Sequence, residues 1–252
     1  MIETEDQGFV RLLRLARPPV NALDVELLAS LDDALAAAAA GSVRAVVLAG
    51  WPGVFSAGLD VRELASGDDG RVGALVLKFG QVQQRLARSP IPVVAAITGH
   101  CPAGGAVMSM LCDRRIMAEG PFRIGLNEVA MGLYPGATVY RCFERLVGPR
   151  HAASLLATGA LLGPREALAV GLVDELVEPE QVTSRALGYA ASLAALPPMA
   201  YRRTRALVRR DLVRLFDEPE ETLDGLLGDG WVTDETRAAA ARVLRGQSDR
   251  ST

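Results

Sequence analysis

The sequence is poor in the side chains that most often carry out chemistry in active sites. Its 252 residues include three cysteines and two histidines. The cysteines, Cys101, Cys112 and Cys142, form no C-x-x-C pair, and their odd number argues against a disulfide framework or a zinc site. We therefore predict reduced, mostly buried cysteines and no metal site.

The sequence also lacks long hydrophobic runs and a strong excess of either charge. No apolar run approaches the roughly 18 residues that a membrane span requires, and residues 1–21 carry acids where a signal peptide would carry bases. The formal net charge of −3 gives no electrostatic reason to bind nucleic acid. We expect a cytoplasmic protein whose partners include neither membrane nor nucleic acid.

Several common catalytic motifs are absent. The sequence has no G-x-x-x-x-G-K-[ST] loop, no G-x-G-x-x-G opening a helix and no H-E-x-x-H. Ser56 lacks the glycine spacing of a nucleophile elbow. His100 and Cys101 are adjacent, and adjacent side chains rarely point the same way, so we do not expect a thiol–imidazole dyad.

Strand-like and helix-like segments alternate over most of the chain. Apolar or β-branched runs predict strands at 9–15, 44–50, 93–99 and 172–178. Stretches with helical spacing predict helices at 24–40, 72–88 and 103–111. This alternation is typical of an α/β fold with parallel strands.

The pattern changes near Pro197, after which no strand is predicted. We predict an α/β core over residues 1–195 and a helical region of three helices over 196–252, the last set apart by Gly228 and Gly230. Its apolar faces must be covered by the core or by another subunit. The arginines within 202–214 form either a solvated helix face or contacts to ligand phosphates or a neighbouring subunit.

Two strand-to-helix junctions place small residues at a helix N-terminus. They are "WPGVFSAGLDVREL" (51–64) and "ITGHCPAGGAVMSMLCD" (97–113). Backbone N–H groups are unpaired at such a terminus, and two converging junctions can form an oxyanion hole. Tight packing of helix on strand by glycine explains the same pattern, so the spacing alone leaves both interpretations open.

Glu128 lies in a largely apolar stretch, flanked by Val129, Ala130 and Met131. A carboxylate in such surroundings either finds a partner or has its pKa raised by desolvation. A carboxylate with a raised pKa is a good general base toward a weak carbon acid. The alternative is a glutamate at an ordinary surface turn.

Taken together, "FSAGLD", "GHCPAGG" and "GLNEVAMGLYPG" resemble the enoyl-CoA hydratase/isomerase family, the crotonase superfamily. The resemblance extends from about Pro18 to the end of the chain. Including "PPVNAL" (18–23), it is strongest with the monofunctional Δ3,Δ2-enoyl-CoA isomerases. It implies a crotonase-like spiral of ββα units, a C-terminal helical oligomerisation region, a homotrimer or hexamer, and an acyl-CoA thioester substrate of fatty acid β-oxidation.

The resemblance also implies site residues. The N–H groups of Ala57 and Gly104 would form the oxyanion hole, and Glu128 would be the catalytic base. No cofactor is implied, since coenzyme A is part of the substrate. Asp60 is in addition expected to start a helix. The substrate-binding residues implied are Ala22, Ser56, Ala57, Gly58, Leu59, Asp60, Val61 and Gly104.

Val107 decides between the reactions of the family. Hydratases carry a second glutamate three residues after the second oxyanion glycine, and Val107 stands there in this sequence. A single base suffices to move a double bond, so we expect isomerisation of 3-enoyl-CoA to 2-enoyl-CoA. The alternatives are an enoyl-CoA hydratase and a non-catalytic acyl-CoA-binding paralogue. We expect apolar residues within 60–88 and 131–134 to line the acyl pocket.

Overall fold

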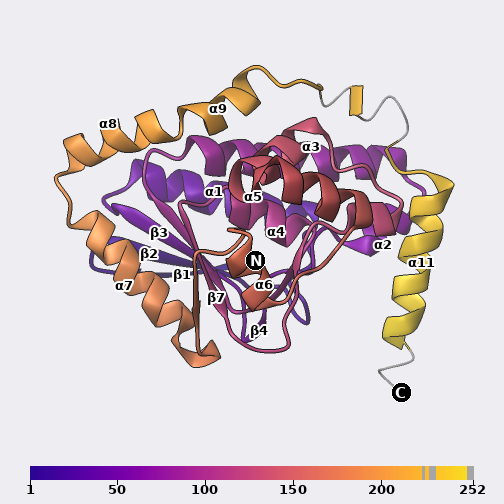
Figure 1. Ribbon diagram of the computed structural model, residues 1–252, viewed down its shortest axis with the longest axis horizontal. Helices are drawn as coiled ribbons and strands as arrows, with labels where there is room; N and C mark the ends of the chain where they lie inside the picture. The colour runs from indigo at the N-terminus through magenta and orange to yellow at the C-terminus, as the bar shows by residue number, and fades with distance from the viewer. Residues whose placement is uncertain (223–224, 227–230, 249–252) are drawn as a thin grey trace.

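A six-stranded sheet lies at the centre of the fold in the computed structural model, which describes residues 1–222, 225–226 and 231–248 (Figure 1). β1 pairs with β2 antiparallel, and every other neighbouring pair is parallel, as the sequence predicts. In sheet order the strands are β1 (Ile2–Gln7), β2 (Val10–Leu15), β3 (Ala45–Ala49), β5 (Val93–Ile97), β7 (Arg114–Ala118) and β9 (Glu175–Val177).

A smaller parallel sheet lies beside the first and is made of β4 (Gly53–Val54), β6 (Gly99–Pro102) and β8 (Ile124–Gly125). Each short strand directly follows a strand of the large sheet, and a helix comes next. The chain therefore repeats a β-β-α unit, and each repeat adds one strand to each sheet. This is the predicted spiral of ββα units, and the mixed α/β fold is confirmed.

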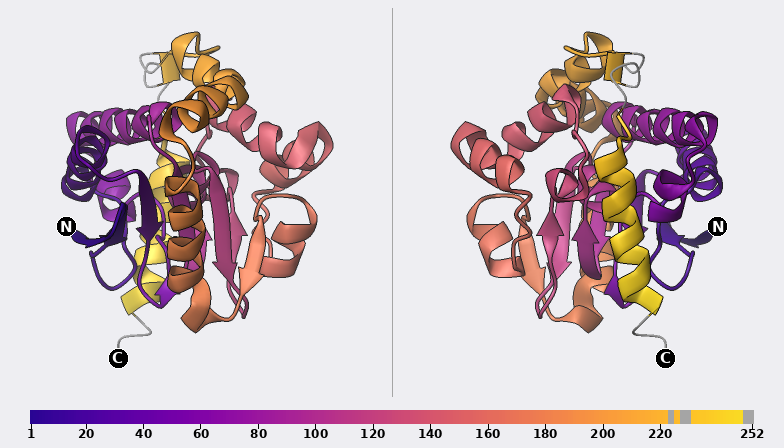
Figure 2. Two further views of the ribbon diagram at one scale, coloured as in Figure 1. Left: turned by 90° about the vertical axis from the view of Figure 1, so that its left-hand side faces the viewer. Right: turned by 90° about the vertical axis from the view of Figure 1, so that its right-hand side faces the viewer.

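The helices before residue 195 cover both faces of the large sheet. α7 packs on one face, and its Ala186 and Ala190 meet Val47 of β3 in a small apolar layer (Figure 2). On the opposite face, Val46 of β3 joins the larger core with α1, α3 and α4. The helices are α1 (Val25–Ala40), α2 (Val61–Ala65), α3 (Asp69–Arg88), α4 (Gly104–Met110), α5 (Ala137–Thr158), α6 (Pro164–Ala169) and α7 (Val182–Ala194), with short 3-10 helices η1 (Glu128–Met131) and η2 (Pro179–Gln181).

The remaining helices are α8 (Pro198–Val208), α9 (Arg210–Asp217) and α11 (Asp234–Ser248). α9 packs on α3 and α5, whereas α11 packs on α2 and η1, so this region covers the core at two places (Figure 1). Gly228 and Gly230, the predicted break before the last helix, lie outside the described residues. The division of the chain near residue 195 stays a prediction.

Two arginines of the 202–214 segment are buried rather than solvated. Arg205 and Arg209 both pair with Asp113, which lies between α4 and β7, with shortest N···O distances of 2.7 and 3.4 Å. Arg209 also donates to the backbone carbonyl of Leu111 at 2.8 Å. A surface interpretation is therefore wrong for these two residues, which hold the helical region onto the core.

No helix within the described ranges is long and apolar enough to cross a membrane.

Candidate active site

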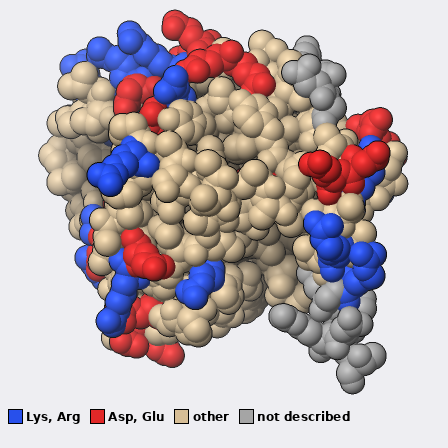
Figure 3. Space-filling model, turned by 45° about the vertical axis from the view of Figure 1, so that its right-hand side comes forward, with Lys and Arg blue, Asp and Glu red and all other residues tan. Residues whose placement is uncertain are grey.

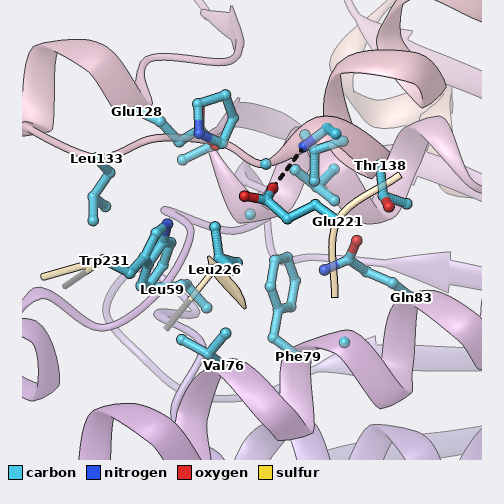
Figure 4. Close-up of a pocket in the computed structure, with 18 of the residues that line it drawn as sticks. Leu59, Val76, Phe79, Gln83, Glu128, Leu133, Thr138, Glu221, Leu226 and Trp231 are labelled. Carbon is cyan, nitrogen blue, oxygen red and sulfur yellow. Dashed lines mark hydrogen bonds between the residues drawn. The ribbon is translucent and has the colours of Figure 1, made fainter. Parts of the chain in front are cut away.

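A cavity of about 330 Å³ lies between α3, η1, the start of α5 and the C-terminal helical region (Figure 4). Most of its wall is apolar. Figure 3 shows a molecular face with a broad uncharged centre and charged side chains toward its edges. The apolar lining includes the expected Leu64, Val76, Phe79, Met131 and Leu133, together with Leu215, Phe216, Pro219, Leu226 and Trp231 of the helical region, which the sequence did not single out for this site.

Ala57 does not offer a free donor to this cavity. Its N–H donates to the carbonyl oxygen of Val20 at 3.0 Å. The neighbouring Ser56 is fully buried, and its hydroxyl donates to the Asn21 carbonyl at 2.8 Å and accepts from the Gly58 N–H at 3.1 Å. The expectation that Ala57 supplies an oxyanion donor is therefore wrong, because that N–H already holds the loop in place.

Leu59, two residues later, presents an unpaired N–H at this junction. It forms a parallel bridge with Leu23, in which Leu23 N–H donates to Gly58 O at 2.8 Å and Asp60 N–H donates to Leu23 O at 2.9 Å. These bonds use the groups on either side of Leu59. Its own N–H has no acceptor among the described residues, and Leu59 lines the cavity.

Gly104 presents an unpaired N–H at the second junction. It is the first residue of α4, and its N–H has no acceptor in the described part of the chain. The preceding Ala103 has φ of 48° and makes no side-chain cap, so no side chain of that residue occupies the Gly104 N–H. Gly104, Ala103 and Val107 all line the cavity.

The two junctions touch each other through glycine. A Cβ on Gly58, whose φ is 86°, would lie 2.9 Å from the Ala103 Cβ and 3.1 Å from the Gly104 nitrogen. Tight glycine packing and unpaired N–H groups are therefore both present. The close approach brings the two junctions to the same side of one cavity.

Glu128 is buried, with 9% of its surface exposed, and it lines the same cavity. Its Oε2 has no hydrogen-bond partner among the described residues. Burial raises the pKa of its carboxyl to about 7. The alternative of a glutamate at an ordinary surface turn is wrong. η1 instead holds a poorly solvated carboxyl group against the cavity.

Asp60 has the capping role that the sequence predicts. Its Oδ1 accepts from the Arg62 N–H at 2.9 Å at the start of α2, and its Oδ2 pairs with Arg17 at 2.7 Å. Of the implied substrate-binding residues, Ala57, Leu59, Val61 and Gly104 line the cavity, whereas Ala22, Ser56, Gly58 and Asp60 do not.

Sequence reasoning missed a second carboxylate. Glu221 lines the cavity from the C-terminal helical region, and its Oε2 accepts from the Ala137 N–H at the start of α5 at 3.3 Å (Figure 4). Val107, at the hydratase position, is buried and apolar. Only the fold brings Glu221 to the cavity, and no local motif marked it.

The histidine–cysteine pair forms no dyad. His100 is exposed and its Nδ1 accepts from the Arg123 N–H at 3.2 Å, while Cys101 is fully buried and burial raises its thiol pKa. All three cysteines are free and buried, which confirms the prediction. Among the described residues, no group of three or more His, Cys, Asp or Glu side chains could hold a metal ion.

The geometry defines a class: an apolar cavity with two unpaired backbone N–H groups and one buried carboxyl group. A family model for enoyl-CoA hydratase/isomerase matches residues 5–222, and the chain belongs to that family, as the sequence motifs indicated. Individual members of the family give a finer comparison.

The human mitochondrial enoyl-CoA delta isomerase 1 is 37% identical over 213 residues, covering 83% of this chain and 70% of the relative. A probable enoyl-CoA hydratase of Rhizobium meliloti is 34% identical over 210 residues, covering 82% and 80%. The crystal structure of human mitochondrial delta3-delta2-enoyl-CoA isomerase superposes with a TM-score of 0.91 at 32% identity, covering 100% of this chain and 99% of that one. An enoyl-CoA hydratase of Mycobacterium ulcerans gives 0.83 at 28% identity, with 90% and 98% covered.

Proposed function

We propose that the protein isomerises 3-enoyl-CoA to 2-enoyl-CoA thioesters in the oxidation of unsaturated acyl chains. The observation that carries the proposal is Glu128, a buried carboxyl without a partner for Oε2, in a cavity with Val107 at the position of the hydratase's second glutamate. The similarity to enoyl-CoA delta isomerases supports it.

In the proposed mechanism, the thioester oxygen accepts hydrogen bonds from the N–H groups of Leu59 and Gly104. These donors stabilise the negative charge that develops on this oxygen. Glu128 removes a proton from C2, and the C–H electron pair forms a dienolate. The protonated Glu128 then returns the proton to C4 while the C2–C3 double bond forms and the thioester carbonyl is restored. The chain's own groups perform each step, and coenzyme A enters as part of the substrate.

The pKa of Glu128, raised to about 7 by burial, suits this role. A general base works best when its pKa lies near the working pH, since it is then both available and basic. The rate at low substrate should therefore fall as pH drops below about 7, because the carboxyl becomes protonated.

Hydration is the second candidate, because the relatives include hydratases. It is the weaker one. The second carboxylate of the cavity, Glu221, is bonded to the start of α5, whereas splitting water calls for two carboxylates oriented on one water molecule. Strong hydration of crotonyl-CoA by the wild type, exceeding isomerisation, would overturn our choice.

The Glu128→Gln variant tests the base. It keeps the shape of the side chain and should still bind acyl-CoA, but isomerisation of 3-hexenoyl-CoA should fall by about a hundredfold to ten-thousandfold. Steady-state kinetics give kcat and calorimetry gives the affinity for acyl-CoA, so the effects on turnover and on binding are measured separately. A variant with a near-wild-type rate would show that another group is the base. Tight binding by the wild type without turnover would favour the non-catalytic paralogue.

The Gly58→Ala variant tests the two donors. Its Cβ would push against Ala103 and Gly104, and loss of one oxyanion donor costs on the order of 3 kcal/mol of transition-state stabilisation. We expect kcat/KM to fall about a hundredfold. Gly53→Ala is the matched control, because Gly53 has a similar φ of 88° and nothing within 4 Å of its added Cβ. Equal losses in both variants would mean that backbone strain, and not the donors, is responsible.

We also propose that the chain assembles as a homotrimer, or as a hexamer of two trimers. Three apolar side chains of α8 support assembly by their exposure: Met199 at 69%, Leu207 at 59% and Val208 at 61%. Large exposed apolar side chains gathered on one helix often mark a site of protein–protein contact. Light scattering on the purified protein tests this, and a monomeric mass would overturn it.

A further inference from the structure

One end of the cavity contains a polar side chain that the proposed mechanism does not use. Gln83 lies on α3, is 9% exposed and lines the cavity. Its carboxamide has no hydrogen-bond partner among the described residues. A carboxamide offers two donors and two acceptor positions, and none of them is occupied by a described residue of the chain. This position therefore favours a ligand that brings a hydrogen-bonding group.

Thr138 provides a second polar group at the same end. It lies in the first turn of α5 and lines the cavity, and its hydroxyl has no hydrogen-bond partner in the described ranges. Figure 4 shows its side chain and that of Gln83 facing each other on the side of the cavity away from Glu128. They do not bond to each other, so both polar groups stay available to a ligand in the cavity.

The wall leading to this end is apolar. Val76, Phe79 and Gly80 lie one to two turns before Gln83 and, at helical spacing, on the same face of α3. An acyl chain that passes Phe79 would pack its methylene groups there before it reaches Gln83. The site thus combines an apolar channel with a polar end.

Glu221 narrows the chemistry of the group that fits. Its carboxyl lines the same cavity, so a chain that ends in a carboxylate would bring two acidic groups together. A neutral hydroxyl meets no such repulsion. It can donate to the Gln83 carbonyl oxygen and accept from the Gln83 amide or the Thr138 hydroxyl.

We propose that this acyl site selects chains that carry a hydroxyl group on the carbons beyond the double bond, bound by Gln83 and Thr138. The inference rests on the proposed function for the placement of the thioester at Leu59 and Gly104. It names the substrate class as hydroxylated 3-enoyl-CoA.

Binding of saturated acyl-CoA thioesters tests the inference without turnover. Hexanoyl-, octanoyl- and decanoyl-CoA are each compared by calorimetry with the same chain bearing a terminal hydroxyl. We expect the wild type to prefer the hydroxylated chain about fivefold to tenfold at one of these lengths, as for one added buried hydrogen bond. Equal affinities at every length would overturn the inference.

Gln83→Leu should abolish the preference and tighten binding of the unsubstituted chain. Gln81→Leu is the matched control, because Gln81 is exposed on α3 and does not line the cavity. A preference that survives in Gln83→Leu would overturn the inference. Thr138→Val, which keeps the side-chain shape, gives an independent reading and should lose part of the preference.

Isomerisation of unsubstituted and hydroxylated 3-enoyl-CoA separates this inference from the proposed function. Isomerisation with no hydroxyl preference overturns the inference alone. A hydroxyl preference in binding, with no isomerisation of any chain, overturns the proposed function alone.

Discussion

Asp60 and Glu128 are two buried carboxyl groups with opposite surroundings. Asp60 is 4% exposed and Glu128 is 9% exposed. Both oxygens of Asp60 are used, one by the Arg62 N–H and one by Arg17. Glu128 has an oxygen without any partner among the described residues, and burial raises its pKa to about 7.

The difference separates a structural carboxylate from one that is available for chemistry. Burial alone does not distinguish them, since both are nearly inaccessible. Their interaction partners distinguish them. A carboxylate that caps a helix and pairs with arginine stabilises the fold, whereas a buried carboxylate without a partner destabilises the folded state once it is charged. Buried carboxylates that destabilise the fold in this way are found mainly at functional sites.

The largest expected effect on stability is that of Glu128→Gln, and it depends on pH. Because the folded-state pKa of about 7 exceeds the ordinary value of 4.5, the folded protein holds the proton more tightly than the unfolded chain. Stability from the neutral carboxyl is full below about pH 4.5 and is lost as pH rises through about 7. The glutamine of the variant does not ionise, so the variant does not lose this stability. Above pH 7 its free energy of unfolding should exceed that of the wild type by up to about 3 kcal/mol.

Urea denaturation at pH 5 and pH 8 measures this difference. The two proteins should differ little at pH 5, and the gap should open toward pH 8. Glu178→Gln, at an exposed glutamate, is the control for loss of a carboxylate as such. A variant less stable than the wild type at pH 8 would mean that Glu128 has a stabilising partner, and the comparison with Asp60 would fail.

Asp60→Asn should change stability in the opposite direction. Asparagine caps a helix about as well as aspartate, so the bond from the Arg62 N–H is kept. The ion pair with Arg17 is lost, although Arg17 keeps Asp24 at 2.7 Å. We expect the free energy of unfolding at pH 7 to fall by about 1 to 2 kcal/mol. Asp60→Ala should lose about 1 kcal/mol more, because the cap is lost too. Thermal and urea unfolding of the three proteins check the series, and no difference between the asparagine and alanine variants would exclude a capping role.

Much of the fold follows from local pattern. The predicted strands at 9–15, 44–50 and 93–99 are β2, β3 and β5. β3 and β5 are continuous apolar runs, as buried parallel strands are, whereas β2 keeps four apolar residues beside the partly buried Arg11 and Arg14. β7 was missed, since its sequence, RRIMA, begins with two arginines. Arg115 is nevertheless buried, with its charge paired to Asp174 at 2.7 Å. That partner is distant in sequence, so no local pattern predicts the strand.

The site was predicted less completely, for the same reason. Glu128 and Gly104 could be named from their motifs. Ala57 was named in place of Leu59, because the choice between two N–H groups depends on Val20, which accepts one of them. Gln83 was overlooked, although its helical register with Phe79 on the apolar face of α3 was a usable signal.

Glu221 is a third carboxyl group, intermediate between the other two, and its replacement should have the smallest effect. It interacts with the Tyr134 hydroxyl, and it accepts a long hydrogen bond of 3.3 Å from the N–H at the start of α5. In Glu221→Gln the side chain can still accept this bond, and only the favourable interaction of a negative charge with the helix N-terminus is lost. We expect the free energy of unfolding to fall by about 0.5 kcal/mol, with isomerisation reduced less than tenfold. Denaturation and parallel assays of 3-hexenoyl-CoA isomerisation and crotonyl-CoA hydration measure both effects. Selective loss of hydration would instead show that Glu221 takes part in the reaction. A hydrogen-bonded carboxyl group in this cavity could then no longer be assigned a structural role from its partners alone.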